Sequence, residues 1–274
     1  MSVDLEDYYS KLPFSEWDKC ESKLLKPTKK ILELFDKYDV KATFFTLGYI
    51  AQKHPELIKE IQSKGHEIAS HSYSHPNLNN LTKEDFEKDL LKSLKIIQEI
   101  TGEKVRGFRS PFFSIKNNEW AFDVLKKYLD YDSSVNPVKI RYGSLDGIGN
   151  APTTVYKMSD KNPYEEDKNG TFLELPVTTL NTPFGRLPMG GGFYLRFFPI
   201  WMLKAAIKQT NKKNFPAIFY IHPADLDPDV PRIAGYRWYS YYGLKNAVQK
   251  FEAILQSFKF SSVRDVLLNS AVNK

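Results

Sequence analysis

The feature of this sequence that most restricts its fold is a regular alternation of short apolar runs with longer amphipathic runs. The short runs are rich in β-branched and aromatic residues, which predicts buried strands. The longer runs carry apolar residues at helical spacing. This alternation predicts an α/β fold with a parallel sheet, open or closed, and helices outside it. The expected strands are residues 2–8, 42–47, 66–70, 105–109, 131–134, 172–180 and 215–221, and the expected helices are residues 24–38, 55–64, 82–102, 120–128, 197–209 and 244–258.

Three residues mark helix ends. Thr82 precedes an apolar stripe and is followed three residues later by Asp85, a pattern typical of a helix start. Gly65 and Gly102 follow the last periodic residues of their helices. We expect both glycines to end those helices, with Gly65 in a left-handed conformation.

The segment 137–171 breaks the alternation with many Gly, Pro, Asn, Asp and Lys residues. Because the alternation resumes afterwards, we interpret this segment as an irregular excursion within a domain and not as a linker. A length of 274 residues fits one large domain or two small ones. The sequence has no internal repeats, and we predict a single domain over residues 1–274.

The charge balance is mildly basic, with 39 Lys and Arg residues against 33 Asp and Glu residues and a net charge of +6. Both signs are interspersed, and no element concentrates the basic residues as a nucleic-acid binder would. We therefore expect no nucleic-acid partner. The excess of positive charge could attract anionic glycans or a membrane surface, but the ordinary interpretation is a solvated protein surface.

The chain has one cysteine, Cys20, so an internal disulfide is excluded. Its first residues lack the basic start and apolar run of a secretory signal. No stretch approaches the roughly 18 to 20 apolar residues of a membrane span. We therefore expect a cytoplasmic protein without a transmembrane segment, with peripheral membrane contact left open.

Polar residues follow the ends of four expected strands, where α/β barrels place their chemistry. The first group is Asp4, Glu6 and Asp7. Three carboxylates so close in sequence repel one another unless a cation or a base lies near them. Strand alternation would place Asp4 and Glu6 on the same side. The ordinary alternative is a solvated, frayed chain start.

The second group is His71 and His75, directly after the strand that ends at Ser70. Two imidazoles four residues apart can bind one metal ion from a helical turn or a tight loop. The alternative is a pair of loop or capping histidines.

The third and fourth groups are Arg109 and His222, each at the end of an expected strand. An arginine at that place can hold a carboxylate ionised, or can form an ordinary surface ion pair. His222 closes an apolar strand, which points it either into a site or into the core. Of its neighbours, Asp225, Asp227 and Asp229 could orient it or only solvate a turn. Together the four groups contain what metal-assisted hydrolysis requires.

In this order the four groups resemble motifs of the polysaccharide deacetylases of the NodB-homology superfamily, carbohydrate esterase family 4. The resemblance is closest to a bacterial branch whose first motif is Asp-x-Glu-Asp-Tyr, and it extends over essentially the whole chain. The matching segments are Asp4-Leu5-Glu6-Asp7-Tyr8, Ser70-His71-Ser72-Tyr73-Ser74-His75, Phe108-Arg109-Ser110-Pro111-Phe112, Tyr131-Asp132-Ser133-Ser134, Gly190-Gly191-Gly192-Phe193 and His222-Pro223.

The resemblance implies a distorted (β/α) barrel with fewer than eight strands. It also implies that Asp4 is the general base, that His222 is the general acid and that Arg109 holds the base. His71 and His75 would bind a divalent metal, Zn²⁺ above all, with Co²⁺ or Ni²⁺ as alternatives. The backbone N–H of Phe112, beside Pro111, would contact the oxyanion.

Two departures from the family pattern affect the site. Most of the superfamily has a second aspartate where this chain has Leu5, so the third metal ligand would be Glu6 or Asp7. Strand alternation favours Glu6, provided that the strand extends that far. Tyr220 stands where an aliphatic residue of the acetyl pocket is usual, so the pocket should differ in shape.

The resemblance predicts a metal-dependent hydrolase that removes the N-acetyl group from an N-acetylhexosamine unit of a bacterial polysaccharide or its precursor. The alternatives are a hydrolase of another small or cyclic amide, and an inactive carbohydrate-binding module. The presence of Asp4, Arg109 and His222 together argues against an inactive module. The aromatic segment 236–242 would be a sugar-stacking wall or plain packing over the barrel mouth. Likewise the glycines 190–192 would permit close approach of a glycan or form only a tight turn.

Overall fold

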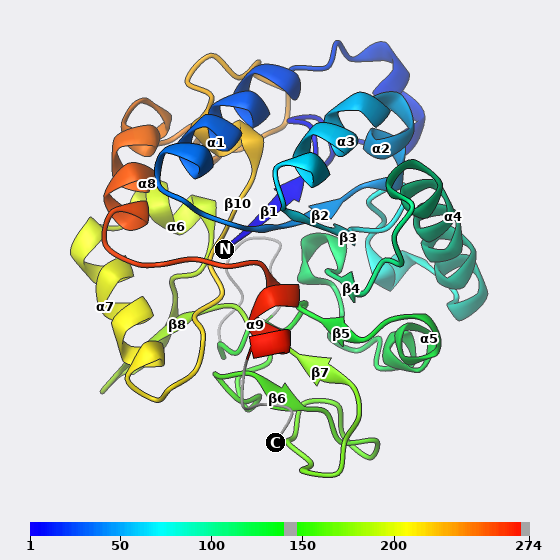
Figure 1. The fold of residues 1–274 in the computed structure, drawn as a ribbon, viewed down its shortest axis with the longest axis vertical. Helices are drawn as coiled ribbons and strands as arrows, with labels where there is room; N and C mark the ends of the chain where they lie inside the picture. Colours follow the sequence, from blue (N-terminus) through cyan, green and yellow to red (C-terminus); the bar gives the residue numbers. More distant parts are fainter. Residues whose placement is uncertain (140–146, 270–274) are drawn as a thin grey trace.

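A computed structural model describes residues 1–139 and 147–269 of the chain. Its main feature is one curled sheet with helices outside it (Figure 1). Seven of its described strands are parallel, and the eighth pairs antiparallel at one edge. In spatial order the strands are β10 (Tyr220–Ile221), β1 (Ser2–Leu5), β2 (Thr43–Thr46), β3 (Glu67–Ser70), β4 (Gly107–Phe108), β5 (Tyr131–Asp132), β7 (Leu173–Glu174) and β6 (Tyr156–Lys157).

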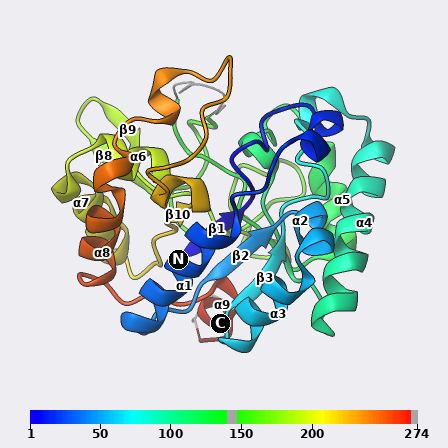
Figure 2. The ribbon, with the colours of Figure 1, turned by 90° about the horizontal axis from the view of Figure 1, so that it is seen from above.

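The helices cover the outer face of this sheet, as Figures 1 and 2 show. Figure 2 also shows that the loops after β1 and β10 lie on the side opposite α9. The helices are α1 (Leu25–Lys37), α2 (Gly48–Lys53), α3 (Pro55–Ser63), α4 (Lys83–Thr101), α5 (Trp120–Tyr128), α6 (Gly192–Phe197), α7 (Ile200–Asn211), α8 (Ala247–Leu255) and α9 (Val263–Asn269).

The expected α/β barrel-type fold is confirmed. In the described part of the chain the parallel strands number seven, in line with a barrel of fewer than eight. The strand β6 brings the whole sheet to eight, because part of the expected excursion pairs antiparallel with β7. The strands β10 and β6 stand at opposite ends of the sheet order, so the described sheet is open.

The first strand is shorter than expected, since it ends at Leu5 and not at Tyr8. The Glu6 N–H donates to the Asp4 carbonyl at 3.0 Å, which turns the chain out of the strand. Glu6 therefore lies outside the strand, and strand alternation does not determine where its side chain points. The last strand of the alternation is also shorter than expected, because only Tyr220–Ile221 pairs within 215–221.

The expected strand at residues 172–180 is wrong, because the chain forms two separate strands there. Pro176 lies between them and has no N–H to donate to a ladder. The first is β7, and the second is β8 (Thr179–Thr182), which forms a hairpin with β9 (Gly185–Pro188). The strand β8 packs against α7 and not in the main sheet.

The expected helix at residues 197–209 is likewise divided into α6 and α7. Pro199 separates them, because a proline inside a helix removes a hydrogen bond and clashes with the preceding turn. The helix expected at 244–258 begins with a 3₁₀ turn, Leu244–Asn246, and its α-helical part ends at Leu255.

The expected helix ends are confirmed. The Thr82 hydroxyl oxygen accepts a hydrogen bond from the Asp85 N–H at 3.1 Å. Gly65 and Gly102 have φ angles of 81° and 68°, as expected for left-handed stops.

Neighbouring residues of the central strands point to opposite sides of the sheet. Phe44 packs in the main core between sheet and helices, whereas Phe45 belongs to an inner cluster with Ala69 and Tyr131. All four residues of β1 are buried, so its polar residue Asp4 is enclosed by the barrel.

The excursion expected at residues 137–171 is partly described. Residues 140–146 lie outside the described part, while the rest contains β6 and irregular turns. Arg186 of β9 donates to the carbonyls of Pro137, Gly149 and Ala151, and so ties the hairpin to this segment. The sheet contains strands from both sides of the excursion. The single-domain organisation stays a prediction.

Candidate active site

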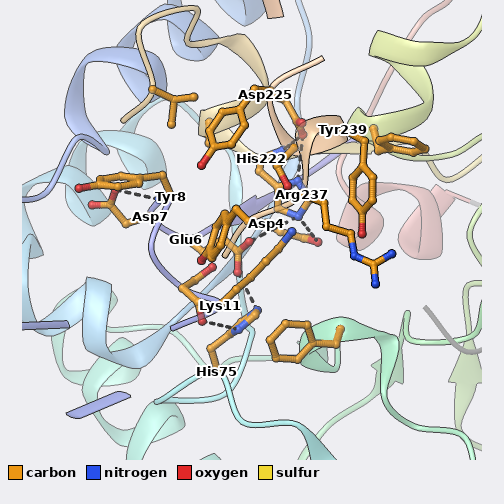
Figure 3. Close-up of a pocket in the computed structure, with 18 of the residues that line it drawn as sticks. Asp4, Glu6, Asp7, Tyr8, Lys11, His75, His222, Asp225, Arg237 and Tyr239 are labelled. Carbon is orange, nitrogen blue, oxygen red and sulfur yellow. Dashed lines mark hydrogen bonds and ion pairs between the residues drawn. The ribbon is translucent and has the colours of Figure 1, made fainter. Parts of the chain in front are cut away.

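A cavity of about 680 Å³ opens at the carboxyl ends of the central strands (Figure 3). The loops after β1, β3 and β10 supply most of its polar lining, and the segment 230–241 supplies one wall. The charged and imidazole residues that line it are Asp4, Glu6, Asp7, Lys11, His71, His75, Arg196, His222, Asp225 and Arg237.

Three buried side chains converge at the floor of this cavity: Glu6, His71 and His75. One potential ligand atom from each lies within 4.8 Å of the other two. Glu6 Oε2 is 2.7 Å from His75 Nε2 and 4.0 Å from His71 Nε2. Carboxylate and imidazole donors at such separations can enclose a divalent cation.

The hydrogen bonds of the two histidines determine which ring nitrogens face Glu6. His71 Nδ1 lies 2.7 Å from the Arg109 carbonyl, and His75 Nδ1 lies 3.1 Å from the Ser10 carbonyl. Since a carbonyl only accepts, each Nδ1 carries the proton. Burial, more than any nearby charge, lowers the pKa of His71 to about 4, so this ring is neutral at pH 7. Its Nε2 therefore presents a lone pair.

Glu6 Oε2 and His71 Nε2 therefore both present electron pairs to the same small space. Glu6 Oε2 is buried and has no donor in hydrogen-bond geometry, although His75 Nε2 is within 2.7 Å. Burial by itself would raise the pKa of Glu6, but the imidazoles of His75, His222 and His71 reverse that effect and keep the pKa well below its usual range. An ionised carboxylate that faces the neutral imidazole of His71 fits a cation site.

The loop between the two histidines is held by Asp89 of α4. Its carboxylate accepts hydrogen bonds from the N–H groups of Tyr73 and Ser74 and from the Ser74 hydroxyl. Ser72 and His75 have left-handed φ angles of 66° and 54°. Non-glycine residues rarely adopt this region, so the backbone conformation of the loop is unfavourable by itself. The hydrogen bonds from Asp89 stabilise this conformation, which turns both imidazole rings toward Glu6.

On one side of this group, Asp4 pairs with the fully buried Arg109. Arg109 Nη1 donates to Asp4 Oδ1 at 2.7 Å, and its other nitrogens donate to the Ser133 carbonyl and hydroxyl at 3.0 and 2.8 Å. The guanidinium also lies 4.1 Å from the Phe45 ring centroid. Several partners thus fix the charge that faces Asp4.

On the other side, His222 forms a chain of contacts with Asp225 and Arg196. His222 Nδ1 and its backbone N–H each lie 2.9 Å from Asp225 Oδ2, and Arg196 Nε donates to Asp225 Oδ1 at 2.9 Å. His222 Nε2 faces the cavity, 3.6 Å from Glu6 and 3.8 Å from Asp4. Burial alone would lower the pKa of His222, but Asp225, Glu6 and Asp4 raise it to about 9.

Of the three aspartates that follow His222, only Asp225 orients it. Asp227 accepts from the Asp229 N–H, and Asp229 lies near Lys26 on the exterior. Close approach of Asp225 also explains one glycine of the segment 190–192. A Cβ atom on Gly192 would lie 1.8 Å from Asp225 Oδ2, so a side chain there would displace the carboxylate. Sequence reasoning singled out this segment but assigned it no partner.

The remaining residues that the sequence singled out lie as follows. Asp7 points away from the histidines, because its carboxylate accepts from the Ser22 hydroxyl and from the N–H groups of Tyr8 and Lys23. Phe112 lines the cavity with a left-handed φ of 56°, and its ring centroid is 4.5 Å from that of His75. Pro111 is buried at the start of the same turn. Tyr220 lines the cavity, and its ring is perpendicular to that of His222 with the centroids 5.5 Å apart.

The aromatic segment 236–242 lies partly inside the cavity and partly at the surface, and sugar stacking on it stays a prediction. Tyr236, Tyr239 and Tyr241 line the cavity, whereas Trp238 and Tyr242 are 67% and 47% exposed. The rings contact one another edge to face, and Phe197 of α6 continues the row through Tyr242. The segment is therefore a wall of the cavity with an exposed outer edge.

Two family models match the chain in succession. Residues 17–128 match the model described as polysaccharide deacetylase, and residues 133–268 match the model described as a domain of unknown function, DUF3473. His71, His75 and Arg109 lie in the first matched segment and His222 in the second.

Curated relatives and solved structures are also similar to this chain. A peptidoglycan-N-acetylglucosamine deacetylase of Bacillus cereus is 33% identical over 123 residues, or 45% of each chain. The match thus spans less than half of that relative's length. A putative polysaccharide deacetylase from Mycobacterium smegmatis shares the fold with a TM-score of 0.61 at 18% identity, covering 97% of this chain and 88% of the other. An allantoinase shares it with a TM-score of 0.59 at 17% identity, covering 97% and 87%.

Among the described residues, none of the helices combines the length and hydropathy that crossing a bilayer requires. The compartment of the protein stays a prediction.

Proposed function

We propose that this chain, which belongs to the polysaccharide deacetylase family, is a metal-dependent hydrolase that removes the N-acetyl group from an N-acetylhexosamine unit of a bacterial polysaccharide or its precursor. The observation that carries the proposal is the convergence of Glu6, His71 and His75 between Asp4 and His222. The name of the Bacillus cereus relative supports an N-acetylated sugar as the substrate class.

Glu6, His71 and His75 are the residues that would hold a divalent ion, Zn²⁺ by preference and Co²⁺ or Ni²⁺ as alternatives. When bound, such an ion polarises the amide carbonyl and makes water a stronger acid. Asp7 takes no part in this proposal, since Ser22, Tyr8 and Lys23 occupy its carboxylate.

In this mechanism Asp4 is the general base. Arg109 Nη1 pairs with Asp4 Oδ1 at 2.7 Å, and in this role the Asp4 carboxylate accepts the proton of the attacking water. Because Arg109 is held by Ser133 and Phe45, Asp4 keeps its place beside the cation donors. Arg109 acts as a positioning residue.

His222 is the general acid that protonates the departing amine. Asp225 supports the charged imidazole, so the ring carries the proton when the amide bond breaks. Such proton transfer typically accelerates a reaction by about 10² to 10⁴. The Phe112 N–H would donate to the oxyanion, and loss of a donor of this kind costs about 3 to 4 kcal/mol. Tyr220 and Pro111 would shape the acetyl pocket around it.

Elemental analysis combined with acetate release tests this proposal. We expect the wild-type protein to retain about one equivalent of divalent metal and to release acetate from a panel of N-acetylated sugars. His71→Ala and His75→Ala should lose both properties, since each removes a donor. His54→Ala is the matched control, because this histidine lies outside the cavity.

Other outcomes would identify the alternatives. A protein that binds no metal and releases no acetate after addition of Zn²⁺, Co²⁺ or Ni²⁺ would be an inactive carbohydrate-binding module. Turnover of cyclic amides without release of acetate from sugars would identify a different amide hydrolase.

A further inference from the structure

Two basic side chains at the cavity, Lys11 and Arg237, have no role in the proposed chemistry. Both line the cavity, and Figure 3 shows them extending toward the same part of it. Lys11 Nζ lies 6.0 Å from the ring centroid of Tyr236, the residue next to Arg237. Both basic side chains therefore belong to the lining of one cavity.

The other charged groups of the cavity have partners, and among them Asp7 accepts hydrogen bonds from the neutral groups of Ser22, Tyr8 and Lys23. Arg196 binds Asp225, Arg109 binds Asp4 below the cavity, and Glu6 faces the imidazole of His75. Within the ranges 1–139 and 147–269, neither Lys11 nor Arg237 has a carboxylate oxygen within 4.0 Å. The cavity thus presents two positive charges that the described protein does not neutralise.

Hydrogen bonds anchor the backbone segments that carry Lys11 and Arg237. The Ser10 carbonyl, directly before Lys11, accepts the hydrogen bond of His75 Nδ1 at 3.1 Å. Arg196 donates to the carbonyls of Tyr239, Ser240 and Tyr242, which anchors the segment that carries Arg237. Both positions are therefore tied to the site through His75 and through the Asp225–Arg196 pair. A fixed backbone lowers the entropy cost of binding a ligand there.

Lys11 and Arg237 are exposed, whereas the three cation donors Glu6, His71 and His75 are buried, so the two basic side chains lie nearer the mouth of the cavity. Burial is the main reason why the pKa of Tyr236 is raised, and the Glu6 carboxylate raises it further. Lys11 lies over the ring of the same residue. An anion at the two cations would therefore belong to a neighbouring part of the substrate and not to the acetyl group.

We propose that Lys11 and Arg237 bind an oxyanion of the substrate, so that the glycan carries a carboxylate or phosphate on or next to its N-acetylated sugar. This inference rests on the proposed function and specifies its substrate class. The planar guanidinium matches the two oxygens of such a group, and the ammonium adds a point charge.

Binding of three probes to the metal-loaded protein tests this inference. The probes are a tetrasaccharide of N-acetylglucosamine, a tetrasaccharide of equal length that contains N-acetylmuramic acid, and N-acetylglucosamine 1-phosphate. We expect at least one anionic probe to bind about tenfold more tightly than the neutral one, as measured by calorimetry. The preference should shrink at high ionic strength, because both cations are exposed.

The double variant Lys11→Gln/Arg237→Gln should lose this preference and leave binding of the neutral tetrasaccharide within about twofold. Arg232→Gln is the matched control, since Arg232 is an exposed arginine that precedes the same segment without lining the cavity. Preference for the carboxylate or for the phosphate probe identifies which oxyanion the site takes. Equal binding of all probes by the wild type, or a preference that survives in the double variant, overturns the inference.

The two proposals fail in different ways. A preference for anionic probes without any acetate release would leave the anion site standing and contradict the deacetylase function. Acetate release from the neutral tetrasaccharide with equal KM in wild type and double variant, and no anionic preference, would leave the function standing and contradict the anion site.

Discussion

Asp225 connects three groups of the site through one carboxylate. Its Oδ2 atom contacts the ring Nδ1 and the backbone N–H of His222, and its Oδ1 atom accepts a hydrogen bond from Arg196. Burial by itself would raise the pKa of Asp225, but Arg196 and His222 hold it far below its usual range. A permanent negative charge behind His222 is what allows this imidazole to stay protonated above neutral pH.

The pH dependence of activity follows from this contact. The pKa of His222 is about 9, raised from 6.5, and a general acid works only while protonated. We expect kcat/KM to fall as pH rises through about 9. In Asp225→Asn the supporting charge is gone, so the alkaline limb should move by about one pH unit or more toward 6.5. An unchanged alkaline limb in this variant would show that His222 is not the acid.

Gly192 shows how a residue without a side chain permits such a contact. A Cβ atom at this position would overlap the Asp225 carboxylate. Gly192→Ala should therefore displace Asp225, cost about 1 to 3 kcal/mol of stability and reduce kcat by at least tenfold. Gly65→Ala is the control, because it strains a left-handed helix end far from the cavity. It should cost about 1 kcal/mol of stability without loss of activity, and equal kcat losses in both variants would contradict a specific role of Gly192.

At the scale of elements, the loop of the two histidines depends on a neighbouring helix. Asp89 of α4 accepts three hydrogen bonds from residues 73 and 74, and the loop contains two left-handed residues. The conformation that directs both imidazoles at Glu6 is thus imposed from outside the loop.

Removal of this anchor should weaken metal binding without removing a ligand. We expect Asp89→Ala to reduce the affinity for Zn²⁺ by about 10- to 100-fold, as second-sphere changes typically do. Competition with a chromophoric chelator would measure this. Glu84→Ala, an exposed acidic residue on the same helix, should leave the affinity unchanged. If Asp89→Ala binds Zn²⁺ as tightly as the wild type, the loop does not need the anchor.

At the scale of the whole molecule, the cation donors link segments that are far apart in sequence. Glu6 follows β1, and the two histidines follow β3, with β2 between these strands. A bound ion would join these strand ends in the folded protein only, because the unfolded chain does not bring the donors together.

Divalent metal should therefore raise the global stability. At a free Zn²⁺ concentration about 100 times Kd, linkage predicts about 2.7 kcal/mol of added stability. Thermal unfolding with and without a chelator would measure it as a change in Tm. His71→Ala and His75→Ala should show little or no shift, and a chelator effect of equal size in these variants would place the ion elsewhere.

Much of this molecule is encoded locally in the sequence. The alternation of apolar and amphipathic runs predicts the parallel sheet and most helices, since burial patterns and end signals such as Thr82 and Gly102 act over a few residues. Residues of chemical interest also stand out, because polar groups at the ends of apolar strands are costly unless they are used or paired. The division of one expected strand at Pro176 and of one expected helix at Pro199 was harder to predict. At each position a proline interrupts the regular backbone within a continuous apolar run.

Only the tertiary structure decides which of these residues meet. Asp7 and Glu6 are adjacent carboxylates, and a turn after Leu5 places Glu6 beside the histidines and Asp7 against Ser22. The roles of Asp89 and Arg196 carry no sequence signal, because they come from hydrogen bonds between residues 15 to 46 positions apart. Ser133 belongs to a segment that the sequence singled out, but its contact with Arg109 appears only in the folded structure. Periodicity reports which face of an element is buried, whereas the position of a charge relative to another depends on how the whole sheet curls.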